Sequence, residues 1–393
     1  MLLVYLDNMV SLNANLIKPL AKCNQSLISK GGLNIIGDNE NALPLDLLLV
    51  IDMSGSMSGD GERIVQQSVI FILDNLMGPD DKVAIITFNN GANLHMNWGD
   101  KNSNPAAFSA GGGTNFGSAI NETLSCLGAH GINPSRAGTV LFLSDGQGQK
   151  ANDENVRTIT EFGFTMHTIG VTSGANPTHL NQMAELARGF YFDAPGFDDV
   201  KKAFSSIFNY GKTVAYAAPD LKIKIEDGVT ISDIVQSPQG VEIAKGPLSA
   251  GNHEVSLSHL VVGMRSDLTF RINVDNVACE DNLLATFECI GGSTELRVKG
   301  TTDDTQILNT SVNVDVTLMT KTGQAARLLK TGDKAGATRI ITQIKTLEKT
   351  HPQASDVTKT LTDVSSKKNQ GEILEGLGKL QTDKSGKTIR RED

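Results

Sequence analysis

Two aspartates and three hydroxyl side chains lie in three short turns of this 393-residue sequence. The turns are "IDMSGSM" with Asp52, Ser54 and Ser56, "GGGTNFG" with Thr114, and "LFLSDG" with Asp145. Carboxylate and hydroxyl oxygens are the ligands that hard divalent cations prefer, Mg²⁺ first, with Mn²⁺ or Ca²⁺ as alternatives. We therefore predict a metal site whose five oxygen groups nearly fill an octahedron. Waters would complete it, and one position would stay open to an outside oxygen.

Residues 44–210 alternate between short apolar runs and amphipathic segments. The strand-like runs are 44–52, 81–88, 138–146 and 164–171, and the helical patterns are 62–77, 115–131, 152–163 and 176–189. This alternation predicts an α/β fold in which a doubly wound, mostly parallel sheet is connected by right-handed crossovers. Ligands bind such sheets beyond the carboxyl ends of the strands. We therefore expect all three turns to open onto that edge.

The pattern changes after Gly211. Short runs that alternate or mix apolar and polar residues are separated by turn formers such as "EDG", "SPQG" and "IGGS", which predicts an antiparallel β-sandwich. The last expected strand is "SVNVDVTLM" (311–319). The period then becomes helical, with two helices expected around "TGD" and a weaker one in "SDVTKTLTDVSS".

Five segments are expected from these changes of pattern. They are N-terminal strands that join the β-sandwich (1–43), the α/β domain (44–211), the sandwich (212–320), a helical hairpin or bundle (321–366) and a charged, partly disordered tail (367–393). The first segment is too short to fold alone, so its strand-like runs, "LLVYL" and "GLNII", suggest a discontinuous sandwich domain.

The three turns together resemble the metal-ion-dependent adhesion site of von Willebrand factor type A domains. The resemblance covers about residues 44–210, with D-x-S-x-S, the glycine-rich loop and "SDG" in order. It extends to a group with a following β-rich region: inter-alpha-trypsin inhibitor heavy chains, bacterial A-domain proteins and plant ubiquitin ligases. It implies that Ser54, Ser56 and Thr114 contact the metal directly, and Asp52 and Asp145 directly or through water. A partner's carboxylate would take the open position.

The resemblance implies a metal-dependent protein-binding module for adhesion or scaffolding, with no catalytic residues, whose partner supplies an Asp or Glu. The alternative is a metal-assisted hydrolase or an accessory subunit of a ubiquitin-ligase-type complex. Against the hydrolase, Ser54 has no G-x-S-x-G surroundings and no general base is evident. Against a ligase acting alone, the chain has no RING-type cysteine and histidine spacing.

Simpler interpretations exist for several polar residues. Asp and Ser are common in turns, so D-x-S-x-S alone is a weak signal. Asp60 and Glu62 are better explained as carboxylates at a helix start than as metal ligands. The segment 100–111 begins like a calcium loop but has proline at the required glycine position and lacks the final glutamate. His167 and His179 are single and are expected to be structural.

The charge composition limits the classes of binding partner. The formal net charge is −9 with a pI near 5.3, which argues against nucleic acid as the main partner. The charge is uneven, because residues 321–393 contain 15 basic and 9 acidic side chains. A solvated helical surface is the plain explanation of this basic tail, and an acidic partner or a membrane surface is the alternative.

The four cysteines have no zinc-ligand spacing. Cys126 is expected to be a buried thiol. Cys279 and Cys289 flank one expected hairpin and are close enough in sequence to bridge, but free thiols in a reducing cytosol are favoured. No apolar run reaches the length of a membrane span, and the N-terminus lacks the pattern of a signal peptide. We therefore expect a cytoplasmic protein without a transmembrane segment.

Overall fold

The computed structural model forms two compact units. It describes residues 10–37, 42–100, 102, 107–171, 175–237, 241–244, 246–367, 370–378, 380–383 and 388–390. Among these residues, the α/β unit takes those of 42–218 and 370–378, and the β-rich unit takes those of 10–37, 219–367, 380–383 and 388–390. The expected strand-like run at 2–6 lies outside the described residues. No helix among the residues described is both long and apolar enough to cross a membrane.

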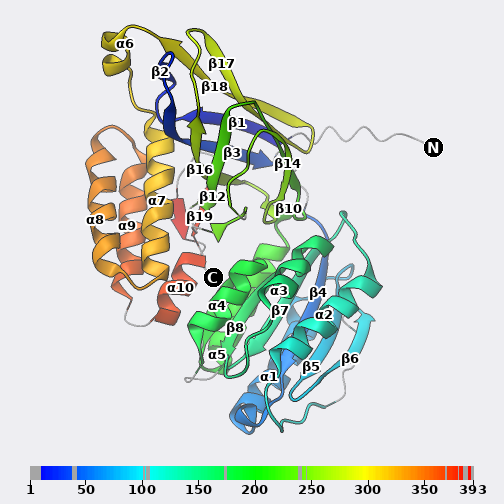
Figure 1. Ribbon diagram of the computed structural model, residues 1–393. Helices are drawn as coiled ribbons and strands as arrows, with labels where there is room; N and C mark the ends of the chain where they lie inside the picture. The colour runs from blue at the N-terminus through cyan, green and yellow to red at the C-terminus, as the bar shows by residue number, and fades with distance from the viewer. Residues whose placement is uncertain are drawn as a thin grey trace, which may run out of the picture. The chain divides into compact units, whose positions relative to one another are not determined.

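The α/β unit is built on a six-stranded sheet of order β6-β5-β4-β7-β8-β9 (Figure 1). Its strands are β4 (Leu45–Asp52), β5 (Lys82–Phe88), β6 (Ala92–Gly99), β7 (Ala137–Ser144), β8 (Phe164–Val171) and β9 (Arg188–Ala194). All neighbouring pairs are parallel except β5 and β6. The residues of β4, β7 and β8 are buried throughout, as expected for central strands covered on both faces. The predicted fold class is confirmed, and β6 adds an antiparallel edge strand.

Helices connect these strands. They are α1 (Asp60–Phe71), α2 (Phe116–His130), α3 (Asp153–Thr158), α4 (Pro177–Leu186) and α5 (Phe197–Gly211), and β10 (Val214–Tyr216) follows α5. Short 3₁₀ turns lie at Gly55–Met57 and Ile159–Phe162, and a π-helical turn lies at Ile72–Leu76. The side chain of Asn176 accepts a hydrogen bond from the backbone N–H of His179 and caps α4, which has Pro177 in its first turn.

The α/β unit also includes a helix from the far end of the chain. Helix α10 (Gln370–Gly378) packs against β9 and α4, and its Ile373, Leu374 and Leu377 are buried. Leu374 belongs to the same apolar core as Phe116. The sequence suggested a charged, partly disordered segment here. Residues 370–378 of that segment form this helix, because their three large apolar side chains cover a core.

The β-rich unit contains two sheets. The first has the order β1-β3-β16-β12-β13, with β19 beside β16 and β20 beside β19. Its strands are β1 (Val10–Leu16), β3 (Leu27–Gly37), β12 (Val229–Ser237), β13 (Val241–Glu242), β16 (Met264–Val274), β19 (Leu380–Asp383) and β20 (Thr388–Arg390). The second sheet has the order β14-β11-β17-β18-β2. Its strands are β2 (Leu20–Lys22), β11 (Asp220–Ile225), β14 (Gly251–Ser256), β17 (Asp281–Cys289) and β18 (Gly292–Thr301), and β15 (Leu260–Val261) is a further short strand.

The N-terminal strands are built into these sheets. Strand β3 pairs with β16 in antiparallel register from Leu27 opposite Val274 to Ile36 opposite Arg265. The rings of Phe270 on β16 and Phe287 on β17 lie 5.7 Å apart, so the two sheets pack against each other through their apolar faces.

Helices follow the last strand of the second sheet. They are α6 (Asp304–Asn309), α7 (Val314–Lys330), α8 (Lys334–Thr346) and α9 (Gln353–Ser366), with a 3₁₀ turn at Leu347–Lys349. The expected strand at 311–319 is wrong, because most of it forms the start of α7. The side chain of Asn313 accepts from the Val316 N–H and begins the helix. Val316 and Met319 then lie against Gly32 of β3. Alternating valines mimic a strand, but the cap and this contact favour the helix.

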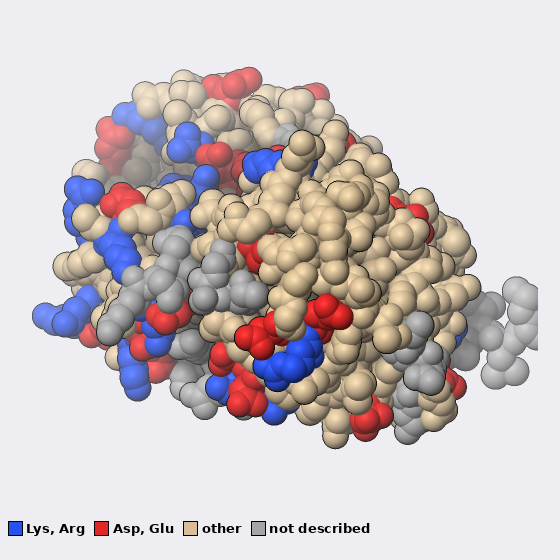
Figure 2. Space-filling view, turned by 90° about the horizontal axis from the view of Figure 1, so that it is seen from below, with Lys and Arg blue, Asp and Glu red and all other residues tan. Residues whose placement is uncertain are grey.

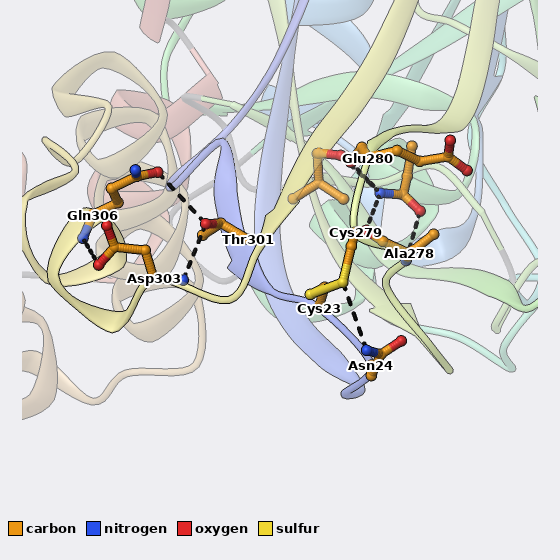
Figure 3. The surroundings of a disulfide bond; sticks show 10 residues. Cys23, Asn24, Ala278, Cys279, Glu280, Thr301, Asp303 and Gln306 are labelled. Atoms are coloured by element: carbon orange, nitrogen blue, oxygen red, sulfur yellow. Dashed lines mark hydrogen bonds between the residues drawn. A yellow bond between two sulfur atoms is a disulfide. The ribbon is translucent and has the colours of Figure 1, made fainter.

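A disulfide joins Cys23 to Cys279, which are 256 residues apart in sequence (Figure 3). The backbone N–H of Cys23 also donates to the Thr301 carbonyl at 3.0 Å, so the segment after β2 is held to the second sheet in two ways. The expectation of free thiols is therefore wrong for this pair, since strand pairing brings the two residues together. Disulfides are rare in a reducing cytosol, so this bond counts against the cytoplasmic location expected above.

The other two cysteines are buried and free. Burial raises the pKa of the Cys126 and Cys289 thiols to about 11. Both are therefore protonated and unreactive at neutral pH, and Cys289 does not pair with Cys279.

Removing the disulfide is expected to destabilise the β-rich unit. We expect the variant with Cys23→Ser and Cys279→Ser to lose about 2–4 kcal/mol of unfolding free energy, because the unfolded chain gains conformational entropy. Urea denaturation would measure the loss. A reducing agent should lower the wild type to the level of the variant and leave the variant unchanged. Equal stability of the oxidised wild type and the variant would contradict the prediction.

Candidate metal centre

Asp52 ends β4 and is fully buried. Its Oδ1 accepts from the backbone N–H of Ser54 at 2.9 Å, and its Oδ2 accepts from the hydroxyl of Ser144 at 2.6 Å. The Ser144 hydroxyl comes from β7 and the Ser54 N–H from the turn that follows Asp52. Together these two donors fix the orientation of the carboxylate. Ser144 was missed from the sequence, where it reads only as the last residue of a buried strand.

The two serines of the first turn place their hydroxyls side by side. Ser54 precedes the 3₁₀ turn Gly55–Met57, and its Oγ lies 3.1 Å from the Oγ of Ser56. Adjacent ligands of an octahedral Mg²⁺ ion are about 2.9 Å apart, given metal–oxygen distances of about 2.1 Å. The two hydroxyls are therefore spaced as neighbouring ligands of one ion. Ser54 is buried and Ser56 is exposed, so the pair lies at the boundary between core and solvent.

The glycine-rich loop with Thr114 is tied to the first turn by its backbone. The N–H of Gly111 donates to the Met53 carbonyl at 2.8 Å, and the N–H of Gly55 donates to the Gly112 carbonyl at 2.9 Å. A Cβ at Gly55 would lie 3.2 Å from that carbonyl oxygen, so a side chain there would press the two loops apart. Thr114, which is partly buried, follows two residues later.

Asn90 supports the same loop from the turn after β5. Its Oδ1 accepts from the N–H of Gly113 at 2.8 Å. Asn90 also was missed, because a polar residue in a turn carries no signal of a partner 23 positions away. It acts as a positioning residue for the segment that leads to Thr114.

Asp145 begins the third loop, directly after β7, and is buried. Its Oδ1 accepts from the N–H of Gln147 at 2.9 Å, and its carbonyl accepts from the N–H of Asn176 at 2.8 Å. The third loop also lies against the second, because a Cβ at Gly148 would be 2.9 Å from the Thr114 methyl carbon.

The two carboxylates of the site act on each other. Burial raises the pKa of Asp52, and the negative charge of Asp145 raises it further, although the hydrogen bonds from Ser144 and Ser54 lower it. The two carboxylates therefore repel each other when both are ionised, and this repulsion is one cause of the raised pKa of Asp52. A bound cation would relieve this repulsion, which is the electrostatic condition expected at a metal site.

The donor set fits a hard cation. It comprises two carboxylates and three hydroxyls in three loops that contact one another. In the described part of the chain, no group of three His, Cys, Asp or Glu side chains is placed to hold a metal, and the five residues contain only two such side chains. A site of this composition depends on its hydroxyl donors, so the five-residue metal set stays a prediction.

Neighbouring polar groups have other roles. Asp60 pairs with Arg63 at 3.0 Å in the first turn of α1. Glu62 accepts from the side chain of Gln66 and from the Ala110 N–H, each at 3.4 Å. His179 is buried, which lowers its pKa, and its ring lies 5.1 Å from that of Phe116. These contacts agree with helix-start carboxylates and a structural histidine.

The three loops lie at the carboxyl-terminal edge of the sheet, where α1 follows β4 at the lower end of the unit in Figure 1. Figure 2 shows the structure from below, and charged side chains form separate groups on a largely uncharged surface.

Residues 46–206 match the family model of the von Willebrand factor type A domain. An uncharacterized protein of Synechocystis sp. is 25% identical over 345 residues, which cover 80% of each chain. Among solved structures, the von Willebrand factor type A protein from Catenulispora acidiphila has a TM-score of 0.70 at 17% identity, with 98% of each chain covered. The ArnB paralog VWA2 from Sulfolobus acidocaldarius has a TM-score of 0.65 at 15% identity, covering 95% of this chain and 97% of its own.

These similarities extend beyond the sheet that carries the site. The family match assigns residues 46–206 to a von Willebrand factor type A domain. The two structural neighbours align with 98% and 95% of this chain.

Proposed function

We propose that the von Willebrand factor type A domain of this chain is a metal-dependent protein-binding module. A divalent cation, Mg²⁺ in the first place, would be held by Asp52, Ser54, Ser56, Thr114 and Asp145. When bound, the ion would act as a Lewis acid for an outside carboxylate. The partner protein would supply an Asp or Glu side chain at the open position.

The observation that carries this proposal is the pair of hydroxyls beside one buried carboxylate. The Oγ atoms of Ser54 and Ser56 lie 3.1 Å apart, and the carboxylate of Asp52 is already held by two donors. Three of the five proposed donors are neutral hydroxyls, so only Asp52 and Asp145 would offset the charge of the dication, and the open coordination position would accept an anionic oxygen. A single contact of this kind gives modest affinity, and the surface around the ion must supply specificity.

Binding to a partner is expected to depend on the metal and on Thr114. Wild-type protein immobilised on beads should capture partners from native lysate with Mg²⁺ present and lose them in EDTA. Thr114→Ala should abolish the same capture, because a donor is lost and the open site is incomplete. The bound proteins would be identified and quantified by mass spectrometry.

Asp60→Asn is the matched control, because Asp60 lies close by in sequence but pairs with Arg63. This variant should capture the same proteins in the same amounts as the wild type. Circular dichroism would show that each variant is folded. Capture that is unchanged in EDTA, or equal for Thr114→Ala and the wild type, would refute the proposal.

A further inference from the structure

The β-rich unit contains a pocket of about 150 Å³ between its first sheet and helix α7. Its charged and polar lining comes from Lys30, Asp233, Thr269, Arg271, Thr320, Gln324 and Arg327. Each of the elements β3, β12, β16 and α7 contributes at least one of these residues. The pocket therefore lies within one unit and is distinct from the candidate metal centre.

The pocket carries an excess of positive charge. Lys30 and Arg271 are directly opposite each other on the antiparallel strands β3 and β16, and like charges in that position destabilise a sheet. The nearest acid is Asp233, whose Oδ2 lies 3.6 Å from Nε of Arg271. Within the described residues, neither Lys30 nor Arg327 has a carboxylate within ion-pair distance. Three cations and one carboxylate leave a formal charge of +2.

A buried donor completes the lining. Thr320 is only 9% exposed, and its Oγ1 has no hydrogen-bond partner among the residues that the structure describes. Thr320, Gln324 and Arg327 are four and three residues apart and so share one face of α7. A buried hydroxyl without a partner costs free energy, and an oxyanion in the pocket would satisfy it. Burial and the charges of Arg271 and Lys321 lower the pKa of Lys30, which agrees with uncompensated positive charge.

A larger groove of about 760 Å³ adjoins the pocket and shares Lys30 and Arg271 with it. Apolar side chains of Ile17, Leu20 and Ile28 line this groove. Ile28 is 75% exposed, although it lies two residues from Lys30 on the same face of β3. The charged pocket thus opens onto a surface suited to an apolar group.

We propose that this pocket binds the dianionic phosphoryl group of a phosphate monoester whose apolar remainder lies in the groove. A phosphoryl group of a monoester carries close to two negative charges at neutral pH, which would balance the formal charge of the pocket. Its oxygens accept hydrogen bonds from Arg, Lys and hydroxyl donors. The pocket is smaller than a site for a whole drug-sized ligand, so it fits a head group, and the groove accounts for the rest.

Calorimetric titration of the full chain with inorganic phosphate and with hexyl phosphate tests the proposal. Both titrations are done in EDTA, so that metal binding does not contribute. We expect saturable binding of both, with hexyl phosphate at least about tenfold tighter because its methylenes leave water. Lys30→Gln and Arg327→Gln should each weaken both ligands about tenfold or more. Asp233→Asn should tighten the binding of both ligands, because it removes the one acid among the described residues that line the pocket.

Lys222→Gln is the matched control, because Lys222 is an exposed cation on β11 of the other sheet. It should bind both ligands like the wild type. Absence of saturable binding by the wild type would overturn the proposal. Equal weakening in Lys222→Gln and Arg327→Gln would also overturn it, since general attraction to the protein charge would then explain binding. Tight phosphate binding without a gain for hexyl phosphate would refute the role of the groove.

Discussion

Asp46→Asn is expected to lower the free energy of unfolding of the α/β unit by about 3–5 kcal/mol, the cost of breaking a buried ion pair. Asp46 lies at the start of β4 and is 2% exposed. Its Oδ1 accepts from Nε of Arg136 at 2.6 Å, and its Oδ2 lies 2.7 Å from Nε2 of His130. The Arg136 side chain is 15% exposed. The asparagine would leave that guanidinium without its charged partner.

Thermal and urea unfolding would measure this loss in metal-free buffer. Arg136 also donates to the carbonyls of Leu45 and Asp80, at 3.1 and 2.7 Å, so it stays in place when Asp46 is changed and its charge stays poorly compensated. Asp60→Asn serves as the comparison, because its exposed pair with Arg63 contributes at most about 1 kcal/mol. Two variants that lose the same small amount would show that the Asp46 cluster is not a stabilising ion pair.

The α/β fold could be predicted because its signal is local. Strands β4, β7 and β8 are mostly apolar and are buried along their whole length, and amphipathic segments separate them. Parallel strands then place their carboxyl ends at one edge, which brings the turns of Asp52 and Asp145 to neighbouring strands without any further information. Most of the candidate site follows from the same rule, because Asp52, Ser54, Ser56 and Asp145 lie at or directly after strand ends, whereas Thr114 lies in the loop before α2.

Features that depend on distant partners were not predictable in this way. Ser144 and Asn90 support the site through hydrogen bonds to residues 92 and 23 positions away. Helix α10 is short and weakly patterned, and its apolar residues gain meaning only from the core they cover. Apolar and polar residues alternate at the start of α7 as they would in a strand. The helix forms there because of its N-terminal cap and its contact with Gly32. The Cys23–Cys279 disulfide depends on how β2 lies against β18, which no local pattern encodes.

Asp145→Asn is expected to abolish the stabilisation of the protein by Mg²⁺ without destabilising the metal-free protein. Asparagine keeps an Oδ1 that can accept from the Gln147 N–H, so the loop should hold its shape. With the carboxylate removed, Mg²⁺ should no longer stabilise the protein. In the wild type the gain should reach about 2.7 kcal/mol at a metal concentration a hundred times the dissociation constant. Thermal unfolding with and without Mg²⁺ measures the stability of the metal-bound and the metal-free protein.

In EDTA the same variant should be at least as stable as the wild type, and the sign follows from the pKa of Asp52. Burial and the charge of Asp145 raise this pKa in the folded protein. The folded state therefore binds more protons than the unfolded state between the two pKa values, and stability falls as pH rises through that interval. Removing the charge of Asp145 narrows the interval between the folded and unfolded pKa values of Asp52. The metal-free variant should therefore lose less stability than the wild type between mildly acidic and neutral pH.

Glu62→Gln is the control for Asp145→Asn, because Glu62 bonds to Gln66 and to the Ala110 N–H outside the proposed metal set. It should keep the full response to Mg²⁺. A wild type that gains no stability from Mg²⁺, Mn²⁺ or Ca²⁺ would contradict the metal site itself. An Asp145→Asn variant that gains as much as the wild type would instead remove Asp145 from the set and leave the first turn and Thr114 as the only donors.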